Sequence, residues 1–334
     1  MRRAFTILLA FALLCATTVP AIAESAPLPI RDYFTYADPE SDAVTSSKND
    51  AYLKQIDALV QTSDVCCESA SLRVTVDEML AADDMTALAW QVTNLCEEPL
   101  YVQCNELDAT FGGVEYDLCG GIDWQNYVIR PGETLSARFE GVLLEDGEPN
   151  SNEFRLNMRL YALPDSMIES ASDFAFTPQE AGLSLKEEFT LRVPMEPQAT
   201  EVRSALPNGE PIERDFGGHS LRVTEASMNA TGVRFTYERI YDTEADARAD
   251  SPTGDQFWDY DFLDSDGAVW ISAAYGDIPD DPVPLPDGRW AWQRSERIYY
   301  MFAQPDTVLL QARFFNGAEY VPDEEECIPL TFAN

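Results

Sequence analysis

The chain has 334 residues, of which 45% are hydrophobic, and its 59 acidic residues against 22 basic ones give a formal net charge of -37. This length exceeds what one core usually organises, so the composition predicts two domains and excludes a chain that is disordered throughout. The charge excludes a basic footprint for nucleic acid and disfavours binding to anionic membrane surfaces. We interpret the acidic excess as a solvated shell, with a surface for a cationic partner as the alternative.

The N-terminus has the three parts of a secretory signal peptide. Met1-Arg2-Arg3 is followed by an apolar run from Ala4 to Ala16 and then by Ala21-Ile22-Ala23, a pattern that predicts cleavage of residues 1–23 before Glu24. The alternative is an uncleaved membrane anchor through residues 4–22. The length of this segment is close to that of a membrane-spanning helix, which needs about 20 residues. The sequence therefore predicts an exported protein that is extracellular or held at the cell surface.

Residues 24–65 are predicted to form a tether and a short amphipathic helix. Glu24 to Ser47 is rich in Pro, Ser and Asp and shows little periodicity, which is typical of a tether. From Lys48 to Gln61 apolar residues recur at helical spacing: Tyr52, Leu53, Ile56, Leu59 and Val60. We expect this helix to dock on the β-unit that follows it rather than on a membrane, because only two lysines accompany its acids.

A repeated pentapeptide divides the rest of the chain. Ser71-Leu72-Arg73-Val74-Thr75 recurs letter for letter at residues 220–224. Each copy opens a strand-like segment in which apolar and polar residues alternate. We predict a first β-sandwich over residues 66–197, with a short helix from Pro164 to Ser172, and then a proline-bracketed linker over residues 198–207.

The second β-sandwich is predicted over residues 208–334. Within it Trp258, Tyr260 and Phe262 share one face of a strand, and Asp259 and Asp261 point the other way, so we expect core packing on one side and solvent on the other. Short antiparallel strands separated by turn signals describe a β-sandwich. The fold prediction is thus all-β: two tandem immunoglobulin-like sandwiches with a short N-terminal helix.

Six cysteines remain if residues 1–23 are removed, and an even number in an exported chain suggests disulfides. Cys104 and Cys119 flank a predicted hairpin through Phe111-Gly112-Gly113, which makes them the first candidate pair. Five of the six cysteines lie in the first unit, so full oxidation would need one bond between the units. A zinc site is the alternative, but no CxxC spacing supports it.

The candidate ligand patch is Trp290 and Trp292, which alternate with Ala291 after a proline-rich loop. Aromatic pairs beside acids bind sugar rings in carbohydrate-binding sandwiches. Aromatic residues at a spacing of two also pack in cores or across strands. The pair therefore supports two hypotheses: it binds a glycan, or it packs in the core or across strands.

The sequence predicts no catalytic residue, no cofactor and no metal ligand. His219 is the only histidine and no G-x-S-x-G nucleophile elbow accompanies it, so we interpret it as a loop residue. The many acids leave an acid-dependent hydrolase as an alternative without locating a carboxylate pair. A calcium site in the loop that holds Asp277, Asp280 and Asp281 is left open by the sequence.

Part of the chain resembles the extracytoplasmic domain of unknown function that follows the membrane segment in some bacterial anti-sigma factors and related exported proteins. The resemblance covers residues 27 to 195, and the second unit is similar to the immunoglobulin-like domain that often follows. It is carried by Pro27-Leu28-Pro29-Ile30, by the segments Tyr52 to Ser63 and Leu72 to Asp84, and by Trp90-Gln91-Val92-Thr93-Asn94.

The resemblance implies a sensing or binding role outside the membrane and no catalytic residues. The family's cytoplasmic sigma-binding domain would precede the membrane segment, where this sequence has Met1-Arg2-Arg3. We therefore expect a free-standing relative, or one that needs a separate membrane partner. The resulting hypothesis is a non-enzymatic exported interaction protein, for which an extracellular protein or cell-wall partner is favoured over a sugar.

Overall fold

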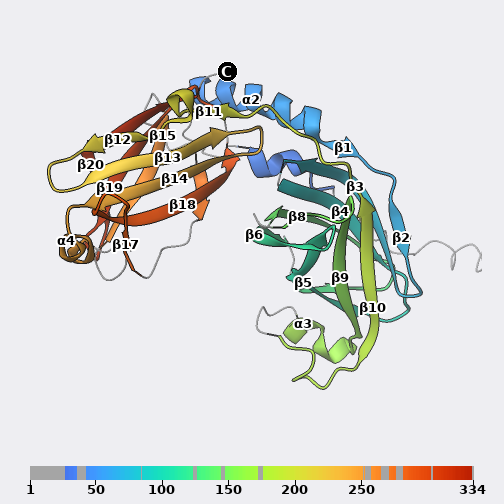
Figure 1. Ribbon diagram of the computed structural model, residues 1–334. Helices are drawn as coiled ribbons and strands as arrows, with labels where there is room; N and C mark the ends of the chain where they lie inside the picture. The colour runs from blue at the N-terminus through green and yellow to red at the C-terminus, as the bar shows by residue number, and fades with distance from the viewer. Residues whose placement is uncertain are drawn as a thin grey trace, which may run out of the picture. The chain divides into compact units, whose positions relative to one another are not determined.

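The computed structural model describes residues 27–35, 43–83, 85–122, 126–143, 147–171, 176–250, 252, 257–264, 271–275, 281–301 and 304–332. The predicted signal peptide or anchor and the loop with Asp277 and Asp280 lie outside the described residues. The chain divides into two compact units, one made of Met1–Ile30 and Gln61–Glu196 and the other of Arg31–Val60 and Pro197–Asn334. Antiparallel strands dominate both (Figure 1).

The first unit is a sandwich of two antiparallel sheets. One sheet has the order β3-β4-β8-β6, with β1 and β2 both paired to β3, and the other has the order β5-β9-β10, with β7 paired to β5. Pairing of β5 with β6 beside their turn links the two sheets. The strands are Gln61–Thr62 (β1), Cys66–Glu68 (β2), Leu72–Ala82 (β3), Met85–Asn94 (β4), Leu100–Phe111 (β5), Val114–Ile122 (β6), Asn126–Ile129 (β7), Thr134–Leu143 (β8), Glu153–Ala162 (β9) and Leu185–Pro194 (β10).

The core of the first unit lies between these sheets. The alternation of apolar and polar residues in the sequence produces this core, because every second residue of a strand faces the same side of its sheet. Both sheets contribute fully buried apolar side chains, among them Leu72, Val74, Trp90, Phe139, Val102, Phe154, Leu156 and Leu191.

The second unit repeats the arrangement of the seven main strands. One sheet has the order β13-β14-β18-β16, with β11 and β12 paired to β13 and β17 paired to β18, and the other has the order β15-β19-β20. The strands are Arg203–Ser204 (β11), Ile212–Asp215 (β12), Ser220–Met228 (β13), Gly232–Tyr241 (β14), Phe257–Asp264 (β15), Ile271–Tyr275 (β16), Val283–Pro284 (β17), Trp290–Met301 (β18), Thr307–Phe315 (β19) and Tyr320–Thr331 (β20).

Both units have the strand order of an immunoglobulin constant-type sandwich. When β3 to β6 and β8 to β10 are lettered A to G, the sheets read ABED and CFG, and β13 to β16 with β18 to β20 give the same reading. The repeated pentapeptide begins strand A in each unit. The prediction of two tandem immunoglobulin-like sandwiches is confirmed.

The predicted helix exists but does not dock where we expected. It is α2, Ala43–Leu59, and it belongs to the second unit rather than to the first. The Tyr52 hydroxyl donates to the carbonyl of Ala230 at 2.7 Å, and Gln198 donates to the carbonyl of Leu59 at 2.9 Å. These contacts draw the helix to the second sandwich, so the predicted docking on the first one is wrong.

Two segments predicted as connections are partly ordered. The tether contains the 3-10 helix η1, Ile30–Phe34, in which both Ile30 and Phe34 are fully buried. The linker contains β11, which pairs with β13, and leads into the 3-10 helix η3, Pro207–Gly209. The predicted short helix near residue 168 is confirmed as η2, Asp165–Met167, and α3, Ile168–Ala171.

The remaining helix is α4, Glu244–Ala249, capped by Thr243, whose side chain accepts a hydrogen bond from the backbone of Asp246. Among the residues that the structure describes, no helix combines the length and the apolar character needed to cross a bilayer.

Gly112 is predicted to be sensitive to substitution. It lies at φ +56° in the β5–β6 turn, and a Cβ there would lie 2.4 Å from the carbonyl oxygen of Ser151. Gly182, at φ +74°, is the comparison, because a Cβ added there would have no other atom within 4 Å. Both changes to Ala add left-handed strain of about 1–2 kcal/mol, but only Gly112→Ala adds a clash. We expect urea unfolding to show a loss for Gly112→Ala that is larger by about 1 kcal/mol or more, and equal losses would contradict the turn geometry.

Candidate functional site

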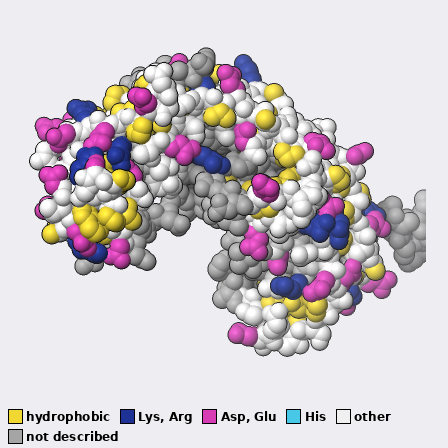
Figure 2. Space-filling view, in the orientation of Figure 1, with side chains coloured by type: hydrophobic (Ala, Val, Ile, Leu, Met, Phe, Trp, Pro, Cys, Tyr) yellow, Lys and Arg dark blue, Asp and Glu magenta, His cyan; other side chains and the backbone are white. Residues whose placement is uncertain are grey.

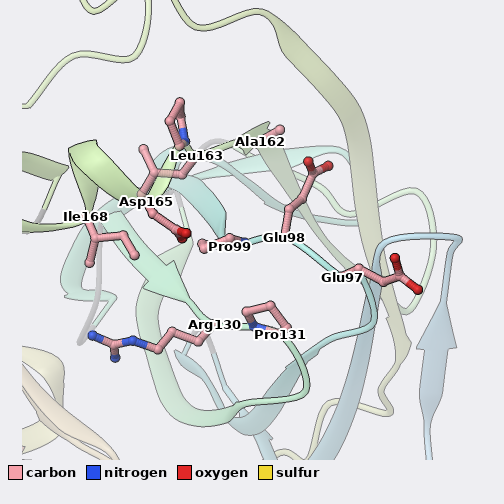
Figure 3. Close-up of a pocket in the computed structure, with 10 residues that line it drawn as sticks. Glu97, Glu98, Pro99, Arg130, Pro131, Ala162, Leu163, Asp165 and Ile168 are labelled. Carbon is pink, nitrogen blue, oxygen red and sulfur yellow. The ribbon is translucent and has the colours of Figure 1, made fainter.

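Three connections meet in a pocket at one end of the first sandwich (Figure 3). They are the β4–β5 loop, the β7–β8 turn and the segment that follows β9, and they enclose a volume of about 520 Å³. In the lettering above, the first and last are the B–C and F–G connections, which carry the binding loops in immunoglobulin variable domains. The pocket is lined by Glu97, Glu98, Pro99, Arg130, Pro131, Ala162, Leu163, Pro164, Asp165 and Ile168.

Asn94, the last residue of β4, holds two of these connections together. It is only 1% exposed. Its side-chain amide donates to the carbonyls of Glu98 at 2.9 Å and Ile129 at 2.8 Å, and its side-chain oxygen accepts from the backbone of Cys96 at 2.7 Å. Both amide protons are thereby used. One buried side chain therefore sets the path of the β4–β5 loop and of the end of β7.

Backbone hydrogen bonds complete the frame of the pocket. Asn94 donates to the carbonyl of Glu133 at 3.1 Å and accepts from Gly132 at 3.0 Å, which fixes the β7–β8 turn. Leu163 donates to the carbonyl of Pro99 at 2.9 Å, which ties the segment after β9 to the β4–β5 loop. All three connections are thus joined to one another.

The segment after β9 is also anchored by its own small core. Tyr101 and Tyr161, on the outer face of strands C and F, pack with Leu163 and Ala171. The Tyr101 ring lies 5.0 Å from that of Phe176, and its hydroxyl donates to the Phe176 carbonyl at 3.2 Å. This wall of the pocket therefore rests on the sandwich.

Charges of both signs line the pocket without neutralising one another. Glu98 pairs with Lys186 at 2.6 Å. Within the described part of the chain, Glu97, Asp165 and Arg130 each lack an ion pair, although all three line one pocket. Figure 3 shows Arg130 and Glu97 on opposite sides, with apolar residues between them. The pocket therefore carries both acidic and basic side chains above a buried apolar floor that includes Pro99 and Leu163.

The second unit places a buried polar residue at the matching position. Leu72 of the first pentapeptide faces Asn94 across the sheet, and Leu221 of the second faces Arg239. Arg239 donates to the Tyr241 hydroxyl at 2.8 Å and forms an ion pair with Asp250, beyond α4, at 3.2 Å. The same position thus ties the B–C connection to strand B in both units.

Arg239 also reaches the facing sheet. It pairs with Glu326 of β20 at 2.6 Å and donates to the Tyr260 hydroxyl of β15 at 3.0 Å. Tyr260 in turn donates to Glu326 at 2.5 Å. Burial raises the pKa values of Tyr241 and Tyr260, so both hydroxyls keep their protons. A charged network therefore joins the two sheets of the second sandwich.

A bulge in β20 turns Glu326 inward. Gln311 faces Cys327 and Arg313 faces Pro322, so the four residues 323–326 stand opposite Ala312 alone. Bulges of this kind re-aim side chains. The Asp323 side chain stabilises the bulge by accepting from the backbone of Glu325 at 3.0 Å and of Glu326 at 3.2 Å. Neither Asn94, Arg239 nor this bulge was singled out from the sequence.

His219 lies against this network and not in the pocket. Its Nε2 atom lies 3.0 Å from Glu326, and its ring lies 5.9 Å from that of Phe216 and 5.8 Å from that of Tyr241. The histidine is thus packed beside a carboxylate that already binds Arg239. It lies in the turn before β13 and is half-buried, as expected for a loop residue.

The predicted tryptophan patch is not an exposed platform. Trp292 is only 2% exposed, and its indole N–H donates to the Ala247 carbonyl of α4 at 2.7 Å. Trp290 is half-buried. The structure therefore assigns Trp292 to the core under α4, because the same face of β18 carries Trp292 and the buried Arg294.

The predicted disulfide between Cys104 and Cys119 is not formed. Cys104 is a free, buried thiol on β5, and burial raises its pKa. Cys119 lies on β6, facing Gly141 of β8, and its side chain lies outside the described residues. Beyond their turn β5 and β6 enter different sheets. The described Cys66, Cys67, Cys96 and Cys327 are also free.

The other predicted residues have structural partners. Trp258, Tyr260 and Phe262 are buried as expected. Asp259 is largely shielded, because it pairs with Arg294 at 3.0 Å and Arg313 at 2.7 Å. Asp281 pairs with Arg248 at 2.6 Å. Among described residues, no group of three or more His, Cys, Asp or Glu side chains could hold a metal ion.

Replacing Asn94 is predicted to loosen the pocket. Asn94→Leu removes the side-chain donor from the buried carbonyl of Ile129 and from the part-buried carbonyl of Glu98, and an unsatisfied buried group costs about 1–3 kcal/mol. We expect urea unfolding of the first unit to show a loss in that range. Asn157→Leu is the matched control, because this exposed residue of β9 has one exposed hydrogen bond, to Thr190. Similar small losses for both variants would contradict the role of Asn94.

Breaking the Arg239–Glu326 pair from one side is predicted to destabilise the second unit. Removing one partner of a buried ion pair costs about 3–5 kcal/mol because the other charge stays buried. We expect such losses from Arg239→Met and from Glu326→Gln, and a double variant that loses clearly less than their sum. Thermal or urea unfolding of the four proteins measures this coupling. Additive losses below about 1 kcal/mol would show that the pair is not coupled.

No family model matches the chain, and no curated protein matches it. Among solved structures it is similar to a conserved domain protein from Bacillus anthracis, with a TM-score of 0.40, 10% identity, and coverage of 82% of this chain and 92% of that one. It is also similar to the E. coli chaperone DraB, with a TM-score of 0.21, 11% identity, and coverage of 71% and 90%. Likenesses at this level say nothing about function.

Proposed function

We propose that this chain is a non-enzymatic, exported or cell-surface interaction protein that binds an extracellular protein or cell-wall partner at the pocket of the first sandwich. The observation that carries the proposal is the frame of that pocket. Three connections are joined to one another around Asn94, while Glu97, Asp165 and Arg130 line the opening. A rigid frame with open charged groups suits recognition, because little ordering is needed on binding.

Export is supported by the sequence of residues 1–23 and by the resemblance to extracytoplasmic domains. The surface fits a partner outside the cell that is not a nucleic acid. Figure 2 shows acidic side chains over the visible face of both units, with Lys and Arg side chains beside several of them. Ion pairs join basic and acidic side chains of the described surface, such as Arg73–Glu68 and Arg159–Asp108. The basic residues therefore stabilise the surface rather than form a footprint for phosphates.

The non-enzymatic part of the proposal is supported by the places of the reactive groups. His219 and Glu326 belong to a buried network whose charges are matched by Arg239. The carbohydrate-binding alternative loses support because Trp292 is buried under α4. The hydrolase alternative needs a pair of carboxylates with distinct roles, and the unpaired pocket acids Glu97 and Asp165 are the residues that a test of it would replace.

Site-specific photo-crosslinking in the native cells tests the proposal. A photo-reactive residue at Glu97 is expected to capture a partner from the medium or the cell envelope, whereas one at Glu210, an exposed acid of the second unit, is expected to capture none. The change Asn94→Leu is expected to reduce capture from Glu97. Equal capture from both positions, or none from Glu97, would overturn the proposal.

A further inference from the structure

The charged groups of the pocket stand out from the rest of the first unit. Between Gln61 and Glu196, the described cationic side chains almost all have partners: Arg73, Arg155, Arg159, Lys186 and Arg192 form ion pairs, and Arg138 donates to the Pro29 carbonyl. Arg130 alone among them lacks a side-chain partner in the described residues. It is left open although two acids, Glu97 and Asp165, line the same pocket.

The frame explains why these opposite charges do not meet. The Arg130 backbone donates to the Glu133 carboxylate at 2.7 Å, and Glu133 donates back to the Arg130 carbonyl at 3.0 Å. Asn94 fixes the neighbouring Ile129. In Figure 3 the Arg130 guanidinium extends to one side of the pocket, Glu97 lies on the opposite side, and Asp165 lies between them and above. A ligand that carries both charges could satisfy all three groups.

The surface between the charges is aliphatic. Pro99, Pro131, Ala162, Leu163 and Ile168 form it, and no aromatic ring lines the pocket as described. Sugar rings are bound mostly by aromatic faces, and phosphates would be repelled by three carboxylates. A volume of about 520 Å³ falls in the range of small-ligand pockets, about 300–1,000 Å³. The lining thus fits a small chain with an aliphatic middle.

We propose that the pocket binds a short peptide whose free carboxylate pairs with Arg130 and whose ammonium group pairs with Glu97 and Asp165. This inference rests on the proposed function and names its ligand class. Arg binds carboxylates with two parallel hydrogen bonds, and each acid can accept from an ammonium group. The same chemistry is present in a free peptide and at the C-terminal end of a partner chain.

Calorimetric or NMR titration of the full mature chain with the tripeptide Lys-Ala-Ala tests the proposal. Its C-terminal amide lacks the carboxylate charge, and its doubly N-acetylated form lacks both ammonium charges. We expect the unmodified peptide to bind about tenfold or more tightly than either, because each modification removes a charge that pairs with the pocket side chains. Dipeptides and tetrapeptides of the same series show which length spans the pocket.

Two variants assign the charges. Arg130→Gln is expected to bind the free acid and the amide equally while still preferring the free ammonium group. Glu97→Gln combined with Asp165→Asn is expected to show the reverse. Arg192→Gln is the matched control, because it removes a cation from β10, outside the pocket, and it should leave both preferences unchanged.

Two results would overturn the inference: equal binding of the acid and its amide by the unmodified protein, or no tripeptide binding at millimolar concentration. If crosslinking from Glu97 nevertheless captures a partner, the interaction site stands and only the ligand class is wrong. If a protein with a free C-terminus competes with the tripeptide and the same protein with a masked C-terminus does not, the source is a chain end.

Discussion

The structure depends on one buried polar side chain in each sandwich, at the position that faces the leucine of the repeated pentapeptide. In the first unit it is Asn94 and in the second Arg239. A buried polar group must find partners or it destabilises the fold, and at the end of strand B the partners available are the connections that leave the sheets. The hydrogen bonds that each of these side chains makes therefore hold the connections at that end of its sandwich in a fixed geometry.

The two units use this constraint differently. Asn94 is neutral, bonds mostly to backbone and shapes an open pocket. Arg239 is charged and needs an anion, which the β20 bulge supplies as Glu326. The same sandwich also buries Glu296, whose pKa is raised by burial, beside Arg294. The core of the second unit is thus polar where the corresponding core of the first is apolar, so we infer that the two modules diverged in how their interiors are stabilised.

Much of the fold could be predicted from the sequence, because alternation and turn signals are local. The pentapeptide marked strand A twice, and Gly112 marked the turn that crosses between sheets. The site could not be predicted, because it depends on which distant segments meet. The residues next to Asn94 in sequence do not distinguish it from a surface asparagine. Its burial becomes evident only when the fold places strand C and the β7–β8 turn beside it. We predicted Trp292 as part of a ligand patch from its sequence neighbours. The helix that covers it, α4, is remote from β18 in sequence, so its contact with Trp292 could not be foreseen. The pairing of Cys104 with Cys119 was predicted from their places on either side of one turn, beyond which β5 and β6 enter different sheets.

Amide hydrogen exchange of the purified protein tests the frame most directly. The N–H groups of Cys96, Gly132 and Leu163 lie in connections, where exchange is usually fast, but each is bonded within the frame around Asn94. The account predicts that these three amides exchange as slowly as those of the central strands, and that all three speed up together in Asn94→Leu. Fast exchange in the unmodified protein, or acceleration of one amide without the others, would show that Asn94 does not hold the three connections as one frame.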